Sequence, residues 1–116
     1  MSEKTYQLYK AKVPEPIFTK FKMLSVKHRK EIPLRDLVTA AIERHVKAVN
    51  KGDAKPVADE LDQYPKDTWV AWTLSVEKDV YKNARIIMVD RELDMFDFVA
   101  TAMLRYLESP VKTLLA

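Results

Sequence analysis

The chain carries one pattern of apolar residues twice, 63 positions apart, and this repeat constrains the fold more than any other feature. The segment YKAKVPEPIFTKFKMLSV (9–26) matches WTLSVEKDVYKNARIIMV (72–89) at that offset. In each copy apolar residues first alternate with polar ones, as in a half-buried strand, and then recur at the three-and-four spacing of a helix face. The period changes at Val13 and again at Val76. A strand followed by a helix is therefore predicted twice.

A second match follows each of these segments. IPLRDLVTAAIERHV (32–46) lies over LDMFDFVATAMLRYL (93–107) at an offset of 61. The difference of two residues falls between the two helical stretches, where turns tolerate changes in length. The whole chain, 1–116, is thus expected to form one domain: repeat one (about 5–50), a linker (about 51–67), repeat two (about 68–108) and a C-terminal tail (109–116).

Each repeat is predicted to contain two amphipathic helices. Pro14 is expected to end the first strand and open a helix, while the acids of EKD (77–79) favour the equivalent helix start in repeat two. Asp94 is a good N-cap with Asp97 at the capping-box position, and Gly52 is a natural left-handed helix stop. The linker offers one helical turn over 57–61. The helices should bury Ile17, Phe21, Leu24, Leu37, Val38, Ala41, Ile42, Val80, Ala84, Ile87, Phe98, Val99, Ala102 and Met103.

One strand with two short helices cannot stand alone, because its strand has no partner. Two copies can pair their strands, about 5–13 and 68–76, as an antiparallel ribbon with four helices on one face. The predicted fold class is therefore α+β. The residues expected to face the helices are Tyr9, Ala11, Val13, Trp72, Leu74 and Val76. The other face would show Leu8, Lys10, Lys12, Ala71, Thr73 and Ser75, on a ribbon about as wide as a DNA major groove admits.

The positive charge belongs to the first half of the chain. Residues 1–51 hold 12 Lys and Arg against 5 Asp and Glu, whereas the remaining residues hold 8 against 12. A basic half can face a polyanion, and the alternative is a solvated surface balanced by its neighbour. The basic run at 27–30 has the same two interpretations: phosphate contacts or a solvated turn.

The residues give no indication of an enzyme or of a bound cofactor. The chain has no cysteine, and His28 and His45 are its only histidines, so neither a metal site nor a catalytic base is expected. Trp72 belongs to the predicted core, while Trp69 is open between packing and stacking on bases. No apolar run reaches the length of a membrane span and no signal peptide precedes the repeats, so a cytoplasmic protein without membrane contact is expected.

The order strand, VPE, helix, turn and LVTAAI resembles the ribbon-helix-helix superfamily of the Arc and MetJ repressors, which read DNA with a β-ribbon. VPEPIFTKF and RDLVTAAI are the more specific pieces, and the resemblance covers most of the chain apart from the linker and the tail. In that family two chains usually build the dimer. Tandem copies imply a single-chain pseudo-dimer, similar to the TraY-type accessory proteins of conjugation.

The resemblance implies sites and a function. The outward strand residues would read bases in double-stranded DNA, with the lysines suited to guanine. Phosphates would be held by helix-start amides and by the basic turn, at Lys27, Arg29, Lys30, Leu34, Arg35, Met95 and Phe96. The expected function is that of a transcriptional repressor of a plasmid, phage or other mobile element, with possible self-association of pseudo-dimers along DNA. The alternatives are a relaxosome or partition accessory factor, or a protein-interaction module that keeps the fold without binding DNA.

Overall fold

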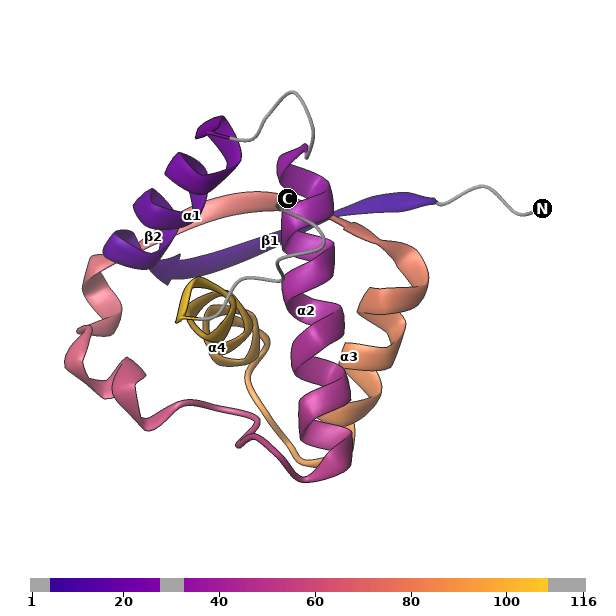
Figure 1. The fold of residues 1–116 in the computed structure, drawn as a ribbon. Helices are drawn as coiled ribbons and strands as arrows, with labels where there is room; N and C mark the ends of the chain where they lie inside the picture. Colours follow the sequence, from indigo (N-terminus) through magenta and orange to yellow (C-terminus); the bar gives the residue numbers. More distant parts are fainter. Residues whose placement is uncertain (1–4, 28–32, 109–116) are drawn as a thin grey trace.

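The computed structural model describes residues 5–27 and 33–108 of the chain. Within them the fold is α+β, with a two-stranded antiparallel sheet and four α-helices (Figure 1). The elements, in chain order, are β1 (Tyr6–Pro14), α1 (Glu15–Lys27), α2 (Leu34–Lys51), the 3-10 helices η1 (Asp59–Gln63) and η2 (Lys66–Thr68), β2 (Trp69–Glu77), α3 (Lys78–Asp90) and α4 (Met95–Glu108).

The two strands pair along their whole length, from Tyr6 opposite Glu77 to Pro14 opposite Trp69. Both strands begin and end one residue later than the sequence predicts. The expectation that Pro14 opens the helix is therefore wrong, because it is the last residue of the ladder and α1 begins at Glu15. Proline is tolerated at this position because the end of an outer strand does not need its N–H.

One face of the ribbon is buried under the helices. Four of the six residues predicted to face inward are at most 3% exposed: Ala11, Val13, Leu74 and Val76. The other two, Tyr9 and Trp72, are half-buried. The Tyr9 ring stacks on Tyr81 of α3 at 3.6 Å between centroids, and Trp72 meets Phe18 of α1 edge-on at 5.0 Å. The predicted alternation is thus confirmed. The two half-buried aromatic residues of the inward face pack against α3 and α1 at the edges of the core.

The second helix of each predicted repeat forms the centre of the molecule. α2 and α4 contact each other, and each of them contacts a strand, whereas α1 and α3 lie on opposite sides of this pair (Figure 1). The predicted core residues of α2 and α4 are at most 1% exposed: Leu37, Val38, Ala41, Ile42, Phe98, Val99, Ala102 and Met103. The predicted core residues of α1 and α3 are buried as well, with the exception of Leu24, which is only half-buried.

The helix ends follow their local sequence. Gly52 caps α2 with φ 80°, a left-handed conformation that costs glycine little, and its N–H donates to the Val49 carbonyl. The Asp94 carboxylate accepts the Phe96 N–H at 2.7 Å, as an N-cap should. Asp97 does not complete a capping box, however, since its carboxylate is paired with the Lys66 ammonium.

The linker is fastened to α4. A helical turn is present as the 3-10 helix η1, two residues later than predicted, with Ala58 and Leu61 buried. The Ala58 N–H donates to the Thr101 hydroxyl at 2.9 Å. The Arg105 guanidinium donates from two nitrogens to the two oxygens of the Glu60 carboxylate, at 2.6 and 3.1 Å. These hydrogen bonds hold the linker between α2 and β2 against α4.

Candidate nucleic-acid interface

The outward face of the ribbon gathers all six residues predicted to read bases. The register places Leu8 beside Ser75, Lys10 beside Thr73 and Lys12 beside Ala71. Five of the six are exposed and Ser75 is half-buried. Paired residues of an antiparallel ladder have Cβ atoms only about 5 Å apart. Two ammonium groups, hydroxyl groups and an exposed leucine therefore share one narrow surface, which offers hydrogen-bond donors and an apolar contact.

An arginine and a tyrosine lie at one end of this ribbon face. Tyr6 donates its hydroxyl proton to the Asp36 carboxylate at 2.5 Å, and the Arg35 guanidinium lies 4.5 Å from the centroid of the Tyr6 ring. The bond to Asp36, followed by burial, raises the pKa of the Tyr6 phenol above its usual range, so the phenol stays protonated at neutral pH. Tyr6 thus anchors the start of α2 to the ribbon and leaves the exposed Arg35 beside it.

The opposite end of the ribbon has a similar set of groups. The Lys66 ammonium lies 3.9 Å from the Trp69 ring centroid and pairs with Asp97 of α4. The Trp69 indole N–H donates to the Tyr64 carbonyl at 3.0 Å, and the side chain is only 6% exposed. This burial answers the question that the sequence left open for Trp69: it packs in the fold and is not free to stack on bases.

The predicted phosphate contacts at the helix starts differ from one another. Arg35 is exposed, whereas Leu34, Met95 and Phe96 are half-buried. The Phe96 amide already donates to Asp94, so an arriving phosphate would have to displace a carboxylate there. Pro33 caps α2 without any side-chain hydrogen bond. The start of α2 is consequently better suited to an anion than the start of α4.

The basic turn is described only at its first residue. Lys27 is exposed at the end of α1, while Arg29 and Lys30 lie outside the described residues. Two cation–ring contacts at the ends of the ribbon, Arg35 with Tyr6 and Lys66 with Trp69, were not predicted from the sequence. Arg35 and Tyr6 lie far apart in the chain, so no local pattern predicts their contact, whereas Lys66 stands only three residues before Trp69 and local spacing could have indicated that contact.

His45 belongs to the core and not to a site. It is 3% exposed, packs 4.8 Å from the Phe98 ring, and its Nε2 lies 2.9 Å from the Pro56 carbonyl. A carbonyl only accepts, so Nε2 carries the proton of a neutral ring. In the part of the chain that the structure describes, no three His, Asp or Glu side chains come close enough together to bind a metal ion.

Acid is expected to destabilise the fold through His45. Burial, with a smaller contribution from Arg105, lowers the pKa of His45 below its ordinary value of about 6.5. The unfolded chain therefore binds more protons as pH falls through about 6.5, and the free energy of unfolding should fall between about pH 7 and 5. Urea unfolding at several pH values measures this slope. His45→Gln keeps a donor for Pro56 without titrating, so its slope should be shallower. An unchanged slope in that variant would contradict the assignment.

Comparisons with protein-family models, with curated proteins and with solved structures find no match to this chain. None of the helices in residues 5–27 and 33–108 combines the length and the apolar composition that a bilayer crossing requires.

Proposed function

We propose that this protein binds double-stranded DNA in a sequence-specific manner, with its β-ribbon in the major groove, and acts as a transcriptional repressor of a mobile element. The observation that carries the proposal is the outward ribbon face. It exposes Lys10 and Lys12 next to Thr73 and Ala71, while the opposite face of the same two strands is buried. A ribbon of this width fits the major groove, where lysine suits guanine O6 and N7 and hydroxyl groups serve several bases.

The proposal includes a single-chain ribbon-helix-helix pseudo-dimer. Two equivalent aromatic contacts between the sequence repeats support it. Tyr9 and Trp72 are equivalent, as are Phe18 and Tyr81, and the two aromatic contacts are Tyr9 with Tyr81 and Phe18 with Trp72. Each repeat thus packs its strand aromatic on the first helix of the other repeat. The same exchange is expected of two chains that form a twofold dimer.

The two halves of the ribbon would contribute unequally. β1 provides both lysines, whereas the outward positions of β2 hold Ala71, Thr73 and Ser75. Positive charge dominates affinity for DNA, because it releases counterions from the phosphates, while small hydroxyl groups contribute mainly to base preference. We therefore assign most of the affinity to repeat one and a share of the sequence preference to repeat two.

A titration of labelled DNA tests the proposal. Fluorescence anisotropy should compare a duplex from the region upstream of the protein's own gene with a shuffled duplex of equal length, at several salt concentrations. The native duplex should bind more tightly at every concentration, and the logarithm of the association constant should fall linearly with the logarithm of salt concentration. Equal affinity for the two duplexes, or a binding constant insensitive to salt, would reject sequence-specific DNA binding.

A further inference from the structure

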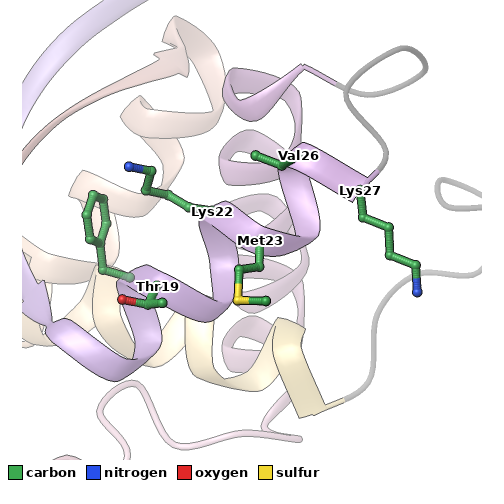
Figure 2. A pocket seen from close by; sticks show the side chains of 6 residues that line it. Thr19, Lys22, Met23, Val26 and Lys27 are labelled. Atoms are coloured by element: carbon green, nitrogen blue, oxygen red, sulfur yellow. The ribbon is translucent and has the colours of Figure 1, made fainter.

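Two helices carry exposed apolar patches at equivalent positions of the repeat. Met23 and Val26 of α1 are 66% and 62% exposed, and Ile86 and Val89 of α3, which lie 63 positions later, are 59% and 68% exposed. Each pair lies within a shallow surface groove. Figure 2 shows the groove on α1, with Lys22 and Lys27 extending in opposite directions on either side of Met23. The groove on α3 is lined by Lys82, Arg85, Ile86, Val89 and Asp90.

The core does not need these side chains. α1 buries Ile17 and Phe21 on its inner face, and α3 buries Ala84 and Ile87. Each helix therefore has a second apolar stripe on the side that points away from the fold. Residues three apart are neighbours on a helix surface, so each pair forms one continuous patch. Apolar patches exposed in this way mark interaction surfaces.

The charges beside the patches differ between the two helices. By helical spacing, Lys20 and Lys27 lie along one side of the α1 patch, and Asp79 and Asp90 lie along the same side of the α3 patch. All four are exposed. On the other side each patch has a cation at the same repeat position, Lys22 or Arg85. The two patches thus share two apolar residues and a cation on one side, and carry opposite charges on the remaining flank, while Lys82 stands one turn before Ile86 where α1 has Thr19.

These flanks select among the possible pairings. When two helices meet antiparallel, the flanks on the same side of their apolar stripes face each other. Two α1 helices would bring lysines against lysines, and two α3 helices would bring aspartates against aspartates. α1 against α3 brings Lys20 and Lys27 against the side that holds Asp79 and Asp90. The other flank holds Glu15 and Lys22 on α1 and Lys78 and Arg85 on α3, so it brings cations together most strongly between two α3 helices and does not favour that pairing.

We propose that the occupant of each patch is a second copy of this chain, docked head to tail. α1 of one copy lies antiparallel on α3 of the next, with Met23 near Val89 and Val26 near Ile86. Such a heterologous contact can repeat along a line. The inference rests on the proposed function, because DNA would align the copies. The patches are small compared with a stable interface of about 1,600 Å², so the contact is weak in free solution, where it needs a high protein concentration, and becomes strong between copies that DNA already holds together.

Disulfide trapping tests the contact without DNA. The chain has no cysteine, so single substitutions report single positions. Met23→Cys and Val89→Cys variants, mixed and oxidised at high protein concentration, should form mixed dimers several-fold more abundantly than dimers of either variant alone. Asp62→Cys, an exposed linker position, serves as the control partner for Met23→Cys. Self-dimers of Met23→Cys as abundant as the mixed species, or no excess over the control, would overturn the head-to-tail contact.

Charge reversal sharpens this test. Lys20→Glu and Lys27→Glu, added to the Met23→Cys chain, should reduce the mixed dimer. Asp79→Lys and Asp90→Lys, added to the Val89→Cys chain, should restore it. A yield that does not depend on these charges would contradict the pairing, because the two flanks alone distinguish it from the alternatives.

A DNA measurement gives the functional consequence. A duplex with two adjacent binding sites should be occupied about tenfold more tightly per site than a duplex with one site. Ile86→Ala with Val89→Ala should abolish this advantage. If mixed dimers form but no DNA is bound, the proposed function fails and the contact stands. If single sites are bound with neither trapping nor cooperativity, the contact alone fails.

Discussion

Replacing Lys10 and Lys12 together by alanine is expected to weaken binding to the preferred duplex on the order of 100-fold. Both side chains lie exposed on the outward face of β1, and alanine keeps the strand while removing both charges. A lost base contact from a basic side chain costs about 1–3 kcal/mol, and each 1.4 kcal/mol is about a factor of ten in affinity. Anisotropy titrations of the native and shuffled duplexes measure the loss.

A matched pair of lysines separates this effect from a general loss of charge. Lys47 and Lys51 are exposed near the C-terminal end of α2, at the other side of the molecule from the ribbon (Figure 1). Lys47→Ala with Lys51→Ala removes the same net charge and should change the affinity only a few-fold. Equal losses in the two double variants would mean that the ribbon does not read DNA. Thr73→Ala should alter the preference between duplexes more than the salt dependence.

Phe98→Ala is expected to lower the free energy of unfolding by about 3–5 kcal/mol. Phe98 is 0% exposed, lies near the start of α4 and packs against the His45 ring of α2, where the two central helices meet. Truncation leaves a cavity that the surrounding helices cannot close. A domain of this size is stable by only about 5–15 kcal/mol, so much of its stability would be lost. Urea unfolding followed by circular dichroism measures the change in midpoint.

Phe96 provides the control for this substitution. It stands two residues earlier on the same helix and is half-buried. Phe96→Ala removes the same number of atoms from a less enclosed place, so its cost should be less than half that of Phe98→Ala. Similar costs for the two variants would place the centre of the core elsewhere.

The sequence by itself determined the elements and which of their faces are buried. Side-chain direction has period two in a strand and 3.6 in a helix, so apolar spacing alone places Val13 and Val76 inside and Lys10 and Thr73 outside. The same spacing predicted the buried faces of α2 and α4. Local rules also sufficed for Gly52 and Asp94, because a helix end is satisfied by its own neighbours in the chain. The boundaries were off by one residue at Pro14, where strand and helix preferences compete.

Only the tertiary structure decided which distant residues meet. The contact of Arg35 with the Tyr6 ring, the attachment of the linker to Thr101 and the pairing of Lys66 with Asp97 join residues that lie far apart in the chain, and no local pattern encodes them. Trp69 illustrates the reason. Strand alternation places it on the outward side with Ala71 and Thr73, yet the linker folds over it and buries it. Periodicity fixes the direction of a side chain, whereas its exposure depends on what the rest of the chain places above it.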